Sequence, residues 1–149
     1  MNLFYKALLI SAIFLTSYET KAQVKTAKSN IFDAYDSKVN CSKSELEKIF
    51  TTSEGSVLKL SFGNNFQFTG TISSSVHRYN NLQSVTIKSN KGDGLLLSIS
   101  KRINDDRSYS YIGRIINPKY GDAFELKSDN AGNYYLNKIK TDDLIEDRE

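Results

Sequence analysis

Apolar and polar residues alternate with a period of two through most of the chain after Ser56. The alternation recurs in seven short segments, at residues 56–62, 66–72, 82–89, 95–101, 108–116, 123–127 and 133–139. Such alternation is typical of strands that bury one face. The stretches between them are short and rich in Gly, Asn and Asp, which favour turns. The pattern predicts a mainly β protein: an antiparallel meander of about seven strands that forms a small barrel or a sandwich.

The connections between the first three of these strands differ in kind. Residues 63–65, Gly-Asn-Asn, tolerate positive φ and predict a hairpin between "SVLKLSF" and "FQFTGTI". Gly70 falls on the apolar side of the second strand, which indicates a bulge or the close approach of another element. Residues 73–83 contain His77, the only histidine, and are interpreted as a connecting loop.

A change of period before the strands predicts one short helix. Ser42 followed by Glu45 has the spacing of a capping box. The apolar residues that follow share one helical face, at Leu46, Ile49 and Phe50. We therefore expect an amphipathic helix that plugs one end of the β structure or packs on one of its faces.

The first residues have the three-part layout of a secretory signal peptide. A short segment with Lys6 precedes an apolar run from Ala7 to Leu15, and a polar stretch ends at Ala22. The run is too short to span a bilayer, and no cysteine follows it to carry a lipid. We expect a secreted or periplasmic protein, cleaved after Ala22, with no membrane contact after cleavage.

The predicted organisation follows from these boundaries. It comprises a signal peptide at 1–22, an N-terminal polar arm at 23–40, a single β-domain with its leading helix at 41–140, and an acidic tail at 141–149. The arm carries one apolar cluster, Ile31, Phe32 and Tyr35. It is interpreted either as a helical turn packed on the body or as an arm that orders only against a partner.

The net charge of the chain adds little to the prediction of its function. Removing residues 1–22 takes away two lysines and one glutamate, which lowers the net charge from +3 to about +2. Basic and acidic residues alternate without long blocks of one sign, which is typical of a solvated surface. Neither the charge nor the predicted export favours a nucleic-acid partner.

Candidate reactive residues are few. With one cysteine, Cys41, the chain is expected to be a monomer with a buried thiol or a dimer linked by an intermolecular disulfide. A nucleophile and base pair of Cys41 and His77 has no local sequence support. The acidic groups at 104–106 and 129–132 have the composition of hairpin turns more than of calcium loops. We therefore predict no catalytic residue, no metal site and no cofactor.

A binding surface is the remaining candidate site. Arg78, Tyr79, Arg107 and Tyr109 fall in or beside predicted loops. Tyrosine provides a large contact area at low entropic cost, which suits interfaces. Tyrosine is also common in strands, so most of the nine tyrosines have a structural interpretation.

The strand series resembles a known group of proteins. The segments "FQFTGTI", "LQSVTIKS", "LLLSISK", "YIGRIIN" and "GNYYLNK", with a signal ending in "KAQ", are similar in style to small secreted all-β proteins of Bacteroidota-type bacteria, among them potempin-like peptidase inhibitors. The resemblance implies a compact β-barrel that binds a protein partner. It assigns no inhibitory residue, because no reactive motif matches a position here.

Three functions are consistent with the sequence. The leading hypothesis is a secreted, non-enzymatic binding protein. Its partner would be another secreted protein, and an exported peptidase that it inhibits is the candidate. The first alternative is a carrier of a small ligand in an apolar barrel cavity. The second is a hydrolase with an unrecognised site, which requires a polar cleft with convergent acids.

Overall fold

The computed structural model describes residues 27–146. The predicted signal peptide, residues 23–26 of the predicted arm and residues 147–149 of the predicted tail lie outside the described residues. The strands are β1 (Lys38–Cys41), β2 (Val57–Phe62), β3 (Phe66–Arg78), β4 (Leu82–Ser89), β5 (Leu96–Ile103), β6 (Tyr109–Ile116), β7 (Asp122–Ser128) and β8 (Tyr134–Lys140). The helices are α2 (Lys43–Thr51) and α3 (Asp143–Glu146).

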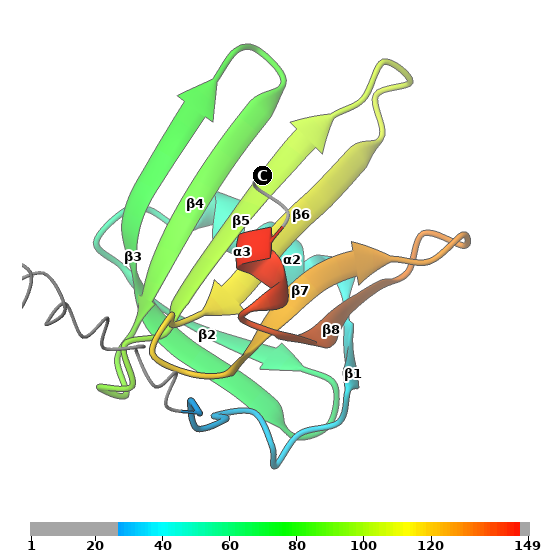
Figure 1. Ribbon diagram of the computed structural model, residues 1–149. Helices are drawn as coiled ribbons and strands as arrows, with labels where there is room; N and C mark the ends of the chain where they lie inside the picture. The colour runs from blue at the N-terminus through cyan, green and yellow to red at the C-terminus, as the bar shows by residue number, and fades with distance from the viewer. Residues whose placement is uncertain (1–26, 147–149) are drawn as a thin grey trace, which may run out of the picture.

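All eight strands belong to one antiparallel sheet in the order β1-β8-β7-β6-β5-β4-β3-β2. Strands β2 to β8 are therefore a meander, which confirms the predicted mainly β fold. The sheet curls into a half-barrel (Figure 1). The eighth strand is β1, at residues that the sequence pattern placed in and beside the polar arm.

Strand β3 corrects one prediction. Residues 73–78 continue this strand instead of opening a loop, so His77 lies on a strand and the connection is only residues 79–81. The register of β3 against β4 shifts between Ile72 and Ser74. This bulge moves the following side chains to the other face of the sheet. The segment beyond the bulge is partly exposed, so its apolar and polar residues do not alternate in a way that the sequence reveals.

The predicted hairpin and the predicted role of Gly70 are confirmed. Phe62 pairs with Phe66 across the turn at 63–65. A Cβ atom at Gly70 would lie 2.5 Å from the carbonyl oxygen of Lys88, so only glycine allows β4 to approach this closely.

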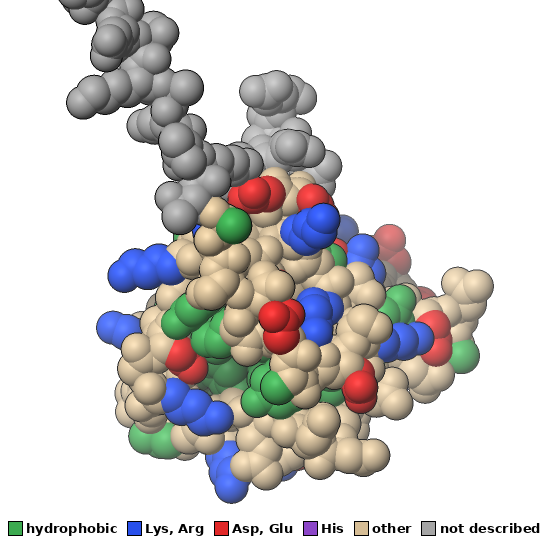
Figure 2. Space-filling view, turned by 60° about the horizontal axis from the view of Figure 1, so that its bottom comes forward, with side chains coloured by type: hydrophobic (Ala, Val, Ile, Leu, Met, Phe, Trp, Pro, Cys, Tyr) green, Lys and Arg blue, Asp and Glu red, His purple; other side chains and the backbone are tan. Residues whose placement is uncertain are grey.

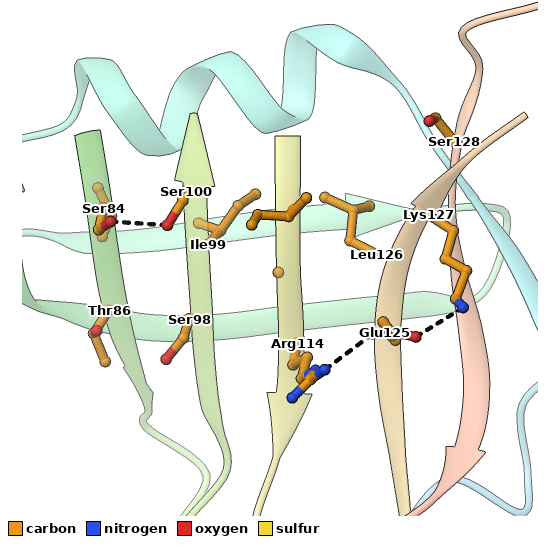
Figure 3. Close-up of a pocket in the computed structure, with 13 residues that line it drawn as sticks. Ser84, Thr86, Ser98, Ile99, Ser100, Arg114, Glu125, Leu126, Lys127 and Ser128 are labelled. Carbon is orange, nitrogen blue, oxygen red and sulfur yellow. Dashed lines mark hydrogen bonds and ion pairs between the residues drawn. The ribbon is translucent and has the colours of Figure 1, made fainter. Parts of the chain in front are cut away.

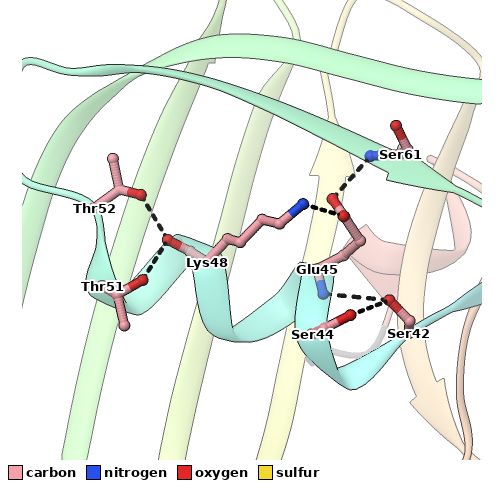
Figure 4. A network of polar contacts seen from close by, with 7 residues as sticks. All are labelled: Ser42, Ser44, Glu45, Lys48, Thr51, Thr52 and Ser61. Carbon is pink, nitrogen blue, oxygen red and sulfur yellow. Dashed lines mark hydrogen bonds and ion pairs between the residues drawn. The ribbon is translucent and has the colours of Figure 1, made fainter.

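The two edges of the half-barrel meet near the end of β2. The Gly63 N–H donates to the carbonyl oxygen of Asn40 at 2.7 Å, which joins β2 to β1. The next outward N–H of β2, at Ser61, donates to the Glu45 carboxylate at 3.1 Å. Helix α2 therefore helps to close the seam (Figure 4).

Helix α2 begins at the predicted N-cap, Ser42, but the Glu45 side chain of the predicted capping box bonds Lys48 and Ser61. The Ser42 hydroxyl accepts the Glu45 N–H at 3.3 Å, which satisfies one unpaired N–H of the first turn (Figure 4). The Glu45 side chain contacts Lys48 and Ser61, and the hydrogen bond to Lys48 holds the pKa of Glu45 below its usual value. The predicted apolar face is buried in the half-barrel, at Leu46, Ile49 and Phe50.

Residues 27–37, which we call the N-terminal segment, pack at the lower end of the core in Figure 1. Figure 2 views the lower end of Figure 1 and shows hydrophobic side chains in a hollow there. Phe32 is 1% exposed, and its ring centroid lies 4.6 Å from that of Phe124 and 5.9 Å from that of Phe66. The buried Asp122 carboxylate accepts the N–H groups of Ile31 and Phe32 at 2.8 and 2.9 Å. The described part of the arm is thus packed on the body.

Candidate interaction surface at the hairpin end

Two hairpins end side by side at the upper end of the sheet in Figure 1. The first turn is residues 79–81, and the second is residues 104–108. The Ile103 N–H donates to the carbonyl oxygen of Asn81 at 2.8 Å, which ties the first turn to the end of β5, directly before the second turn. The structure therefore brings both predicted binding loops to one place, which we call the hairpin end.

Each turn contains a non-glycine residue with positive φ. Tyr79 has φ 60° and Arg107 has φ 64°, and no other non-glycine residue among residues 27–146 has a positive φ. This conformation is uncommon for residues with a side chain, and such positions concentrate at functional sites. Tyr79 is also 87% exposed, so a large aromatic surface faces solvent at a constrained position.

The second turn is held by its own polar side chains. The Asp106 carboxylate accepts the Ser108 N–H at 2.9 Å and the Ser108 hydroxyl at 2.6 Å, which holds the pKa of Asp106 below its usual value. The Asn104 side chain also bonds Ser108, at 2.9 Å. These oxygens stabilise the turn, as the turn interpretation predicts.

The four predicted residues lie at one end but not on one face. Arg78, Leu82 and Arg102 form one cross-strand row, and both arginines are exposed, so Arg78 faces away from the core. Tyr109 is 52% exposed on the opposite face, where the Lys101 ammonium lies 5.1 Å from its ring centroid. We therefore expect Arg78 and Tyr79 to contribute more to a partner on the outer face than Tyr109.

A groove on the outer face was missed by sequence reasoning. One hollow of about 600 Å³ lies over β4 to β7, and a second of about 410 Å³ reaches Tyr79. Both are lined by Ser100 and Ile112, so they adjoin. We call this surface the outer groove; its principal side chains are Ser84, Ser100, Arg102, Ile112, Arg114 and Lys127. Figure 3 shows its larger part.

Polar contacts hold the walls of the outer groove. The hydroxyls of Ser84 and Ser100 lie 2.8 Å apart across β4 and β5 (Figure 3). Glu125 pairs with Arg114 at 3.2 Å and with Lys127 at 3.0 Å. Partial burial raises the pKa of Glu125, but the hydrogen bonds from Lys127 and Arg114 outweigh burial and hold it below the usual value. Glu125 is therefore ionised at neutral pH.

Cys41 and His77 are not brought together. Cys41 lies on β1 and is 6% exposed, whereas His77 is exposed near the far end of β3 (Figure 1). Burial raises the pKa of the Cys41 thiol to about 12. The Cys41 thiol is free and buried, so an intermolecular disulfide would require it to become exposed.

We expect the Cys41 thiol to be nearly inert in the native protein. A pKa near 12 instead of 9.0 lowers the thiolate fraction at pH 8, so reaction with Ellman's reagent should be about a thousandfold slower than after denaturation. The native rate should rise about tenfold per pH unit up to pH ~11, whereas the denatured rate levels off above its own pKa. Equal rates, or a disulfide-linked dimer band on non-reducing gels, would contradict this picture.

Side chains of the described residues pack in the interior, where the carrier alternative would place its ligand. Leu58, Phe68 and Leu97 are 9%, 3% and 3% exposed and belong to one hydrophobic core, together with the packed rings of Phe32, Phe66 and Phe124. A ligand could enter this space only if the core opened.

The acidic residue of the last predicted turn has a structural role. Asp129 accepts the N–H groups of Ala131 and Asn133 at 2.9 Å and so forms the predicted β7–β8 turn. Within residues 27–146, no three His, Cys, Asp or Glu side chains are grouped closely enough to hold a metal ion.

Comparison with protein-family models, curated proteins and solved structures found no significant match. The resemblance to secreted peptidase inhibitors therefore remains a prediction. None of the helices within residues 27–146 has the length and hydropathy needed to cross a membrane.

Proposed function

We propose that this protein is an exported, non-enzymatic binding protein whose hairpin end contacts a secreted protein partner. The observation that carries the proposal is Tyr79, which is 87% exposed with φ 60° in a turn tied to the end of β5. An exposed tyrosine in a constrained loop can bury a large area while losing little conformational freedom.

An exported peptidase is the candidate partner, as the resemblance implies. Such a peptidase would be contacted by the two turns at the hairpin end rather than by a covalent group, because the chain's only thiol is buried on β1. Inhibition would then arise from steric blocking of the peptidase. Arg78 and Arg107 would add charge contacts at the edge of the interface.

Partner capture with matched variants tests the proposal. The mature protein, immobilised and exposed to culture supernatant, should retain one partner in stoichiometric amount. Tyr79→Ser combined with Arg78→Glu should weaken capture at least tenfold, which is the scale of an interface hot spot. The control is Val57→Ser with Lys59→Glu, an exposed apolar and basic pair on β2, away from the hairpin end.

The outcome that would overturn the proposal is also defined. If no partner is retained and a panel of exported peptidases shows no inhibition, the binding function fails. If a partner is retained equally by both double variants, the hairpin end is not its contact surface.

A further inference from the structure

The outer groove exists because the sheet divides. Strand β6 pairs with β7 only from Gly113 to Ile115, although β5 pairs with β6 along its whole length. Residues 109–112 of β6, before Gly113, run to the hairpin end, while β7 turns away with β8 (Figure 1). The Tyr134 hydroxyl fills the division by accepting the Tyr111 N–H at 3.3 Å. The groove is thus part of a hydrogen-bonded framework.

An apolar side chain lies where the two hollows join. Ile112 is 69% exposed there and is paired with Ser100, which is paired with Ser84. Val76, next in this cross-strand row, is 43% exposed. Exposed apolar residues flanked by small hydroxyls can bury a ligand's apolar group while the hydroxyls bond its polar atoms.

The charge around Ile112 is mainly positive. Arg102, Arg114 and Lys127 line the groove against one acid, Glu125, which already pairs with Arg114 and Lys127. Arg102 is exposed and has no ion-pair partner among residues 27–146. Arg78 adds a further positive charge in the same cross-strand row as Arg102. This surface is complementary to an acidic ligand.

We propose that the outer groove binds an acidic, extended peptide segment of the partner, with one apolar side chain over Ile112 and carboxylates on Arg102 and Arg114. This inference rests on the proposed function, because it assigns the chemistry of the partner. The exposed Ile112 and Val76 favour a peptide over an anionic glycan, since a glycan offers no aliphatic side chain to bury.

A defined probe tests the groove without the natural partner. The probe is a fluorescein-labelled peptide with two glutamates on each side of a leucine, titrated with the purified mature protein and followed by anisotropy. The proposal predicts saturable binding that weakens as salt increases. The same peptide with lysines in place of glutamates should bind at least tenfold more weakly.

Variants localise the binding. Arg102→Glu and Ile112→Ser should each weaken binding of the glutamate peptide at least fivefold, whereas the control Lys59→Glu on β2 should leave it unchanged. Both sites are exposed, so circular dichroism and thermal unfolding should match the parent protein.

Three results of the binding assays would overturn the inference. They are no saturable binding, equal binding of the two peptides, and tighter binding of a sulfated oligosaccharide that depends on Arg102 but not on Ile112. If supernatant capture depends on Tyr79 but not on Arg102 or Ile112, this inference fails while the proposed function stands.

Discussion

Replacing Phe124 by alanine is expected to lower the free energy of unfolding by about 4 kcal/mol. The Phe124 side chain is fully buried, and its ring centroid lies 4.6 Å from that of Phe32 and 5.4 Å from that of Phe66. It therefore joins β7, β3 and the N-terminal segment in one aromatic cluster. Its loss removes apolar burial and leaves a cavity that these rings cannot fill. Urea denaturation measures the change as a lower midpoint at constant slope.

The matched control is Ile112→Ala. Ile112 is 69% exposed, so its truncation should change stability by less than about 0.5 kcal/mol. If Phe124→Ala cost under about 1 kcal/mol, the interior would not be packed as described. The carrier alternative, which needs an open interior, would then return.

Asp122→Ala is expected to destabilise the protein by about 3 kcal/mol and to release the N-terminal segment. The buried Asp122 carboxylate accepts the N–H groups of Ile31 and Phe32 at 2.8 and 2.9 Å. Alanine would leave both donors without a partner beside the core, and unsatisfied buried donors cost about 1–3 kcal/mol each. Urea denaturation measures the stability, and the rate of trypsin cleavage after Lys28 and Lys38 measures release of the segment.

Asp122→Asn distinguishes the effect of losing hydrogen bonds from the effect of losing side-chain volume, because asparagine and aspartate have nearly the same size. The amide oxygen can still accept one of the two N–H groups, so its effects should lie between those of the parent protein and Asp122→Ala. Cleavage of Asp122→Ala at the parent rate would show that Asp122 does not anchor the segment.

The strands that sequence predicts best are those that bury alternate side chains in the core. In β2 the odd and even residues are cleanly separated by exposure, so the segment at 56–62 was recognised within one residue. The helix was found for a similar reason, because Ser42 and the spacing of Leu46, Ile49 and Phe50 are local signals.

Two strand segments are invisible to the same reasoning. Strand β1 has four residues and two buried positions, Val39 and Cys41, which is too short for a period to emerge. The end of β3 lies beyond a bulge and is hydrogen-bonded to β4 on one side, so its side chains are not sorted by burial. Strand β1 forms by pairing with the distant β8, and the end of β3 forms by its hairpin pairing with β4; a burial pattern reports neither.

The candidate site also has one part that the sequence predicts and one part that it does not. Turn composition was enough to locate Arg78, Tyr79, Arg107 and Tyr109 near loops, and the structure gathers them at one end. The outer groove was not predictable, because Ser84, Ser100 and Ile112 come from three strands and meet only once the register is known. Ile112 did give a signal, since its strand is apolar on both faces.

Photo-crosslinking from the hairpin end tests the central claim most directly. A benzophenone amino acid placed at Tyr79 in the exported protein should, under ultraviolet light, form a covalent adduct with one secreted protein. The same group at Val57, which is 64% exposed on β2, should form little or none. Adducts absent from position 79, or equally abundant at both positions, would contradict the claim that a partner binds at the hairpin end.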